Sequence, residues 1–224
     1  MYCVIVGDII GSREMDFETR EAATEAIKEV LLKINEKYKD AILANFGLVR
    51  GDALEGVLTA SQYAPPIIQE IIRDVHRTQK VKLRFSVAID ALSVVSSDRN
   101  EADGPAFYTA VERLNELKEV KSDHWLQISF VMNTAAQPLL DSFFSLISAL
   151  TEEWTDRQRE IAWAMDESFG GQNAVSEALG ISPPAVSKQL KAMHYNVYSW
   201  AWLNLEWYLL KMEESKSQQG VAAV

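Results

Sequence analysis

Cysteine and histidine are scarce in this 224-residue chain, and their placement excludes several classes of site. The single cysteine, Cys3, lies in an apolar run, so no disulfide can form within one chain and a reducing, cytoplasmic setting is expected. The three histidines, His76, His124 and His194, are far apart and lack the spacing of metal ligands. The sequence therefore predicts neither a disulfide scaffold nor a Cys/His metal centre.

Long hydrophobic runs are also absent. The N-terminal segment MYCVIVGDII has no basic flank and is interrupted by Asp8, so no targeting peptide is expected. The apolar segment 197–210 is broken by Asn204 and Glu206 and is shorter than the roughly 20 residues of a membrane span. The glycines at Gly7 and Gly11 lack the spacing and the lysine of a phosphate-binding loop. We expect a protein with no membrane partner and no phosphate loop of that kind.

Positive charge is in short supply, because the formal net charge is −10. This is unfavourable for a nucleic-acid binder, since Lys and Arg supply most of the non-specific affinity for phosphate. The acidity is not uniform, however. Between Gln172 and His194 only Glu177 opposes Lys188 and Lys191, a local net charge of +1. A single module of this charge should bind DNA weakly, and useful affinity would need two copies with half-sites roughly 34 Å apart.

The pattern of apolar residues predicts an α+β protein with two domains. Residues 1–150 alternate between strands and helices, which favours a ferredoxin-like or palm-like α/β sandwich with a mainly antiparallel sheet. Residues 151–224 read as an all-α domain with a helix-turn-helix and an aromatic C-terminal helix. The expected strands cover residues 2–10, 41–49, 53–58, 83–92 and 125–132, and the expected helices of the first domain cover 17–38, 63–75, 104–118 and 139–150.

The segment 172–193, QNAVSEALGISPPAVSKQLKAM, predicts two short helices joined by a tight turn. Val175, Ala178 and Leu179 give the first helix one apolar face, and Gly180 is the residue type that tolerates a left-handed helix exit. Ser182 is a typical N-cap, and Pro183 suits the first helical position because its missing N–H is not needed there. This is the pattern of a helix-turn-helix.

In such a motif the second helix enters the major groove of DNA, and its exposed residues read bases or contact phosphates. A glutamine pairs with adenine, a serine with several bases, and a lysine with guanine or phosphate. Double-stranded DNA is therefore the expected partner. An ordinary helix pair used only for packing is the alternative. The predicted DNA-binding residues are Ser182, Ala185, Ser187, Lys188, Gln189 and Lys191.

The segment YNVYSWAWLNLEWYLLKM, after Met193, predicts a helix with aromatic residues on all sides. A helix of this kind has more apolar surface than one small module can bury. We therefore expect it to form a homodimer interface. Packing against the N-terminal domain is the alternative.

Two aspartates stand out in the first domain. Asp8 interrupts a run that otherwise favours burial, and Asp52 follows Gly51 in a predicted hairpin. If the first strand neighbours that hairpin, both carboxylates converge at one edge of the sheet, where they suit Mg²⁺ with water and a phosphate ligand. The alternative is that Asp8 caps a turn and Asp52 lies at a hairpin tip in water.

Three stretches, GDIIGSR, RGDALEG and DGPAFYTAVERL, together with the C-terminal helix-turn-helix, resemble the SatD family of bacterial proteins over nearly the whole chain. That family is linked to acid tolerance, and the resemblance implies a DNA-binding protein. More distantly, the first domain resembles the palm-like catalytic domain of class III nucleotide cyclases and diguanylate cyclases. That resemblance implies metal ligands at Asp8 and Asp52. In those cyclases an Asn stands four residues before a transition-state Arg. The Arg position is matched here by Arg113, but the Asn position holds Thr109, which departs from the cyclase pattern.

Together these patterns predict a DNA-binding bacterial transcriptional regulator whose first domain senses a ligand or mediates assembly. A metal-dependent nucleotide-binding or cyclase-like enzyme, with Mg²⁺ and a nucleotide as cofactors, is the second hypothesis. A pure interaction protein, in which the helix pair is only a packing device, is the third.

Overall fold

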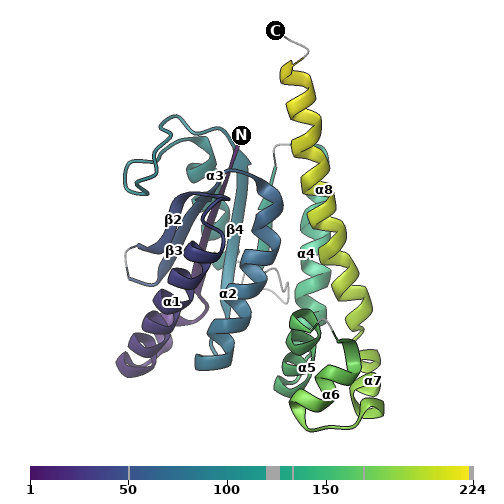
Figure 1. Ribbon diagram of the computed structural model, residues 1–224. Coiled ribbons are helices and arrows are strands. Elements are labelled where there is room, and N and C mark those ends of the chain that lie inside the picture. Colours follow the sequence, from purple (N-terminus) through teal and green to yellow (C-terminus); the bar gives the residue numbers. More distant parts are fainter. Residues whose placement is uncertain (50, 120–126, 133, 169, 222–224) are drawn as a thin grey trace.

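The computed structural model describes residues 1–49, 51–119, 127–132, 134–168 and 170–221 (Figure 1). Its strands are β1 (Tyr2–Ile9), β2 (Ile42–Val49), β3 (Ala53–Leu58), β4 (Leu83–Asp90) and β5 (Ile128–Val131). Two short 3₁₀ helices are η1 (Ser12–Glu14) and η2 (Ser61–Tyr63). The α-helices are α1 (Phe17–Lys37), α2 (Ala64–Gln79), α3 (Pro105–Glu119), α4 (Gln137–Glu152), α5 (Asp156–Glu167), α6 (Gly171–Leu179), α7 (Pro183–Ala192) and α8 (Tyr195–Val221).

The strands form one mixed sheet in the order β2-β3-β1-β4-β5. β1 lies in the middle, antiparallel to both β3 and β4, and β2 pairs antiparallel with β3. β5 runs parallel to β4, because α3 carries the chain back across the sheet between these two strands. The expectation of an α+β chain with a mainly antiparallel sheet is confirmed.

β1 is covered on both of its faces, which explains its almost uninterrupted apolar sequence. Alternate side chains point to opposite faces of a strand. Cys3 and Ile5 join the core under α1 and α2, whereas Val4 and Val6 pack against α3. The sheet therefore carries helices on both sides, with α1 and α2 in front of it in Figure 1.

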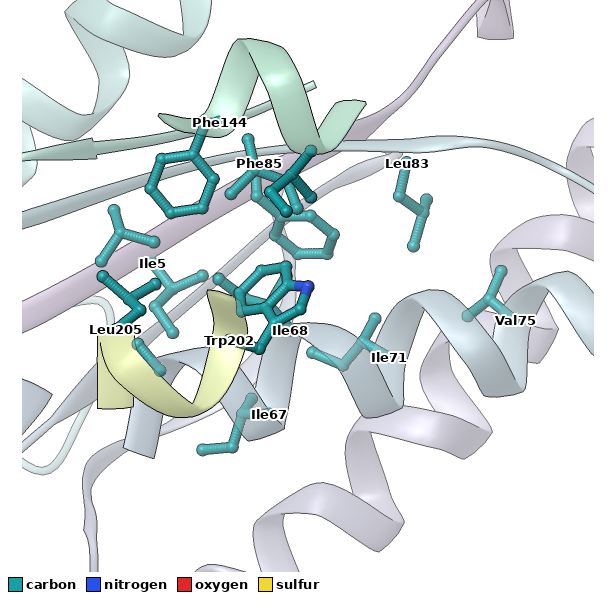
Figure 2. Close-up of a cluster of buried hydrophobic side chains, with 14 of the residues drawn as sticks. Ile5, Ile67, Ile68, Ile71, Val75, Leu83, Phe85, Phe144, Trp202 and Leu205 are labelled. Atoms are coloured by element: carbon teal, nitrogen blue, oxygen red, sulfur yellow. The ribbon is translucent and has the colours of Figure 1, made fainter. Parts of the chain in front are cut away.

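The long helix α8 lies beside the sheet and packs against the first half of the chain (Figure 1). Trp202, Leu205 and Leu209 are buried in the same continuous core as the strands and α2. Figure 2 shows Trp202 and Leu205 close to Ile68, Phe85 and Phe144. Because this core runs across residue 150, the division of the chain into domains at that position stays a prediction.

Aromatic and polar contacts strengthen this packing. Phe144 of α4 stacks on Phe130 of β5 with ring centroids 4.9 Å apart, and it meets the edge of Trp202 at 5.9 Å. The hydroxyl of Ser61 donates a hydrogen bond of 2.9 Å to Glu213, near the far end of α8. α8 is thus tied to the sheet along much of its length.

The ends of some elements differ from the sequence prediction. α8 continues to Val221, beyond the aromatic segment that predicted it, which ends at Met212. Lys, Met, Glu and Gln are good helix formers, so the helix continues beyond its apolar part. β5 is shorter than the predicted strand 125–132, and Trp125 lies outside the described residues. In the part of the chain that the structure describes, no helix is both long and apolar enough to cross a membrane.

The packing of Phe144 generates the first prediction. Its side chain is fully buried and links β5, α4 and α8. We expect Phe144→Ala to lower the free energy of unfolding by about 3–5 kcal/mol, because a buried ring is replaced by a cavity. Leu139→Ala, at a side chain 73% exposed on the same helix, should change it by less than about 0.5 kcal/mol. Urea denaturation measures both. Equal effects of the two substitutions would contradict this packing.

Candidate functional site

The α6–α7 pair is joined by a tight turn whose geometry matches the sequence prediction. Gly180 has φ 63°, in the left-handed region, and its N–H bonds to carbonyls of the last turn of α6. The N–H of Ile181 donates to the Ser176 carbonyl at 3.0 Å. Ser182 then caps α7, with its side chain accepting a hydrogen bond from the N–H of Ala185, and Pro183 is the first residue of the helix. The turn therefore sets α7 at a fixed angle to α6.

Buried side chains on the inner faces hold the pair together. Val175 of α6 and Val186, Leu190 and Met193 of α7 and its end are all buried. Ala178, predicted on the apolar face of α6, is exposed, and Ser176 is buried in its place with its hydroxyl donating to the Asn173 carbonyl at 2.7 Å. α6 therefore buries a different side from the one predicted. Ser176 tolerates burial because its hydroxyl bonds to a backbone carbonyl of the same helix.

Two side chains that the sequence reading missed anchor the pair to its surroundings. The indole N–H of Trp154 donates to the Met193 carbonyl at 3.0 Å, at the end of α7. Arg157 of α5 donates to the Leu179 carbonyl at 3.0 Å, at the end of α6. Their targets are backbone carbonyls at helix ends, which no side-chain pattern in the sequence reveals.

The outer side of α7 faces solvent, at the end of the molecule away from the C-terminus (Figure 1). Ser182, Lys188 and Lys191 are exposed, and Ala185, Ser187 and Gln189 are partly exposed. In the described part of the chain, neither Lys188 nor Lys191 has a carboxylate within ion-pair distance. Gln189 is less free than expected, because its side-chain oxygen accepts a hydrogen bond of 3.2 Å from Gln158 of α5.

An ionic cluster links α5, the support of this pair, to α2. Glu167 accepts two hydrogen bonds from the Arg77 guanidinium, at 2.7 and 2.8 Å, and lies 3.1 Å from Nε of Arg73. The hydrogen bonds from Arg77 hold the pKa of Glu167 below its ordinary value. His76 lies 3.3 Å from Asp156, and burial lowers the pKa of the His76 imidazole. α5 is therefore fixed to the first half of the chain by bidentate charged contacts.

A second candidate site is a cavity of about 620 Å³ at one edge of the sheet. Asp8 is near the end of β1, and Asp52 lies in the turn between β2 and β3. Because β1 pairs with β3, both residues reach this cavity. The other lining residues are Ile9, Gly11, Ser12, Arg13, Glu14, Arg84, Asn115, Lys118 and Glu119.

Two cations that the sequence reading missed surround Asp8. Its Oδ2 lies 2.9 Å from Nζ of Lys118, at the end of α3, and its Oδ1 lies 3.6 Å from the Arg84 guanidinium. Asp8 is buried, and Oδ1 has no hydrogen-bond donor among the described residues. Arg84 stands directly across from Asp8 in the β1–β4 pairing, a register that became known only with the sheet order.

Arg113 lies apart from the two aspartates. Its guanidinium donates to Ser129 and Asp141 at 2.9 Å each and to Glu116 at 2.8 Å. It lines a separate hollow of about 190 Å³ together with Thr109. The arginine that the cyclase resemblance singles out is therefore not among the residues around the Asp8 cavity.

The ionic cluster on α5 generates a pH prediction. A carboxylate with a lowered pKa contributes stability above its unfolded pKa, and this contribution is lost as the pH falls through the folded value. We therefore expect Glu167→Gln to lower the melting temperature at pH 7 and to have a smaller effect near about pH 3, because the contribution begins to be lost below the unfolded pKa of about 4.3. Glu177→Gln, at an exposed glutamate of α6, is the control. An equal effect of Glu167→Gln at both pH values would show that the charge contributes nothing.

Comparison with known proteins gives a family. No curated protein matches the chain. A family model described as the SatD family matches residues 2–201, which include the Asp8 cavity, the α6–α7 pair and the first turns of α8. Because this match covers most of the sequence, the chain belongs to the SatD family.

Proposed function

We propose that this protein binds double-stranded DNA through α7, as a transcriptional regulator with a C-terminal helix-turn-helix. The observation that carries the proposal is the exposed outer side of α7, where Lys188 and Lys191 are free of carboxylate partners in the described chain. The N-cap at Ser182 and the glycine turn at Gly180 hold this side in a fixed orientation.

The proposed contacts follow from the position of each residue on α7. Ser187 and Lys188 lie on the outward side of the helix and would face base edges in the major groove. Lys191, in the last turn, is placed to contact phosphate. Ser182 uses an oxygen lone pair for the cap, but its hydroxyl proton remains available for a phosphate oxygen. Gln189 would have to exchange its bond to Gln158 for one to a base.

The charge of the whole chain sets the conditions for binding. The net charge of −10 repels DNA at long range, whereas α7 presents two lysines locally. Binding by so few phosphate contacts should be weak and confined to low ionic strength. A function as regulator would therefore depend on two copies of α7 acting on one duplex.

The test is fluorescence anisotropy with the duplex upstream of the protein's own gene. We expect wild-type binding at low salt, and a loss of affinity in Lys188→Ala and Lys191→Ala, because each removes a cation from the contact surface. The slope of log K against log salt should fall by about 1 for each lysine that contacts phosphate. Lys33→Ala, at an exposed lysine of α1, is the matched control and should bind as wild type does. Absent binding, or identical binding by all four proteins, would overturn the proposal.

A second candidate function is binding of a nucleotide with Mg²⁺ in the Asp8 cavity. The observation in its favour is the buried Oδ1 of Asp8, which lacks a hydrogen-bond donor and lines the same cavity as Asp52. In the described residues no group of three or more Asp, Glu, His or Cys side chains can hold a metal. Two carboxylates suit Mg²⁺ only if phosphate oxygens and water complete its coordination. The ion would supply charge neutralisation between Asp8, Asp52 and the phosphates.

The other cavity residues favour binding without turnover. Lys118 already balances the charge of Asp8, and it would have to turn toward a phosphate when a metal ion binds. Arg84 and Arg13 are further cations in the cavity wall. Arg113 is held by Ser129 and Asp141 in a different hollow, where it does not reach this ligand.

Thermal shift with ATP and GTP, each with Mg²⁺ or Mn²⁺, tests this second function. We expect a nucleotide that binds to raise the melting temperature by about 2–4 °C for each kcal/mol of linked stabilisation. Asp52→Asn should abolish the metal-dependent part of the rise, because it removes a ligand from a partly exposed position. Asp40→Asn, at an exposed aspartate outside the cavity, should keep it. No rise in the wild type, or the same rise in Asp52→Asn, would retire this function.

A further inference from the structure

The helix α8 has two apolar sides, and only one of them is covered. Tyr198, Trp202, Leu205 and Leu209 face the core and are buried. On the opposite side four large apolar residues are exposed, with exposed fractions of 69% for Trp200, 58% for Leu203, 61% for Trp207 and 38% for Leu210. We call these four residues the α8 stripe. Packing against the first half of the chain covers one side of α8. The other side is left for the homodimer interface that the sequence also predicted.

The α8 stripe is large enough to form a stable interface. A whole tryptophan has roughly 250 Å² of surface, so the stripe with neighbouring Val197 and Tyr208 exposes on the order of 600 Å² of side chain. Pairing two such surfaces would bury about 1,200 Å², which lies within the range of specific interfaces. Monomeric proteins rarely leave an apolar patch of this size in water.

We infer that the α8 stripe binds the α8 stripe of a second copy of this chain, with the two helices antiparallel. The intervals along the stripe, from Trp200 to Leu203, to Trp207 and to Leu210, are 3, 4 and 3 residues, so they are the same from either end. Reversing one helix places Trp200 opposite Leu210 and Leu203 opposite Trp207. Each layer then joins one large and one smaller side chain, as close packing requires.

The polar residues beside the stripe lie on its two flanks, because helical spacing places Asn204 on one side of it and Glu206 on the other. In the antiparallel pair each flank meets the same flank of the partner, so Asn204 lies beside Asn204 of the second copy and the two amides can hydrogen-bond to each other. Glu206, the charged residue in the segment from Tyr195 to Leu210, lies beside its own copy on the other flank, where the two carboxylates repel. A two-fold axis brings identical surfaces together, so a stripe that complements its own reverse is what such an interface needs.

The charge of this surface does not suit the other occupants. A membrane-binding or nucleic-acid-binding helix carries Lys or Arg near its apolar or aromatic residues, and α8 has none before Lys211. The chain as a whole is acidic and repels anionic lipid and nucleic acid. A different protein remains an outcome of the test, since it would leave the isolated chain monomeric.

The first experiment measures the mass of the full chain by sedimentation over a range of concentrations. We expect a species of twice the 25.2 kDa chain mass for the wild type. Leu203→Glu should sediment as a single chain, because it places a charge in the centre of the interface. Leu32→Glu, at a leucine 69% exposed on α1, makes the same change elsewhere and should remain a dimer. A monomeric wild type, or a dimeric Leu203→Glu, would overturn the inference.

The second experiment tests the orientation by disulfide cross-linking. Val197 and Asn204 lie about two helical turns apart on the same side of α8, and both are exposed. In the antiparallel pair Asn204 lies near the two-fold axis, whereas the two copies of Val197 are about 24 Å apart along the helix. Asn204→Cys should therefore form a covalent dimer on oxidation and Val197→Cys should not. Cys3 is buried and does not compete. Equal cross-linking of both variants, or none, would rule out the antiparallel pair.

This inference does not rest on DNA binding, and the two can fail separately. A dimer that ignores DNA would retire the regulator proposal and leave the interface intact. A monomer that binds DNA with loss of affinity in Lys188→Ala would retire the interface and leave DNA binding through α7 intact. Charged substitution at Leu203 leaves α7 untouched, so its effect on DNA affinity reports the contribution of pairing.

Discussion

Burial of the inner side of α8 against the sheet and α2 is the interaction on which the rest of the architecture depends. Trp202 meets Phe144 in an edge-on ring contact, and Phe144 stacks on Phe130 of β5, so one set of rings connects α8 with α4 and β5. The residues of this core are fully or almost fully removed from water, and such burial is the main favourable term in folding. Without it, α5 would still be held to α2 by the contacts of Glu167 with Arg77 and Arg73, but the core shared by the sheet and α8 would be lost.

That packing also determines what α7 presents to solvent. The Trp154 indole and the Arg157 guanidinium bond to carbonyls at the ends of α7 and α6, so the pair is positioned from the inside. The structural contacts made by its outer side among the described residues are the cap at Ser182 and the hydrogen bond that Gln189 accepts from Gln158. Two lysines without a carboxylate partner among the described residues, on a helix of fixed orientation in an acidic protein, are the feature on which the proposal of a DNA partner rests.

The charges around Asp8 explain part of the cavity by structural stability alone. A carboxylate buried in a strand requires positive charge nearby, and Lys118 and Arg84 supply it. This arrangement stabilises the end of β1 without any ligand. Asp52 has no ion pair with these cations among the described residues and yet lines the same cavity, which is the reason for proposing that a ligand binds there.

The sequence by itself determined the local features of this protein. The order of strands and helices, the left-handed exit at Gly180 and the cap at Ser182 each depend on residues within one or two turns, so a pattern of neighbours is sufficient to predict them. The convergence of Asp8 and Asp52 on one cavity was also predictable, but only on the condition that β1 lies beside the hairpin.

The tertiary structure alone decided which surfaces and charges meet. The cations around Asp8, the bond from Gln158 to Gln189 and the exposure of Ala178 depend on strand register and helix phase across elements. For α8 the sequence showed apolar residues all round, but not which side the sheet would cover. Contacts between distant segments are set by packing of the whole core, and a single residue pattern is compatible with several such packings.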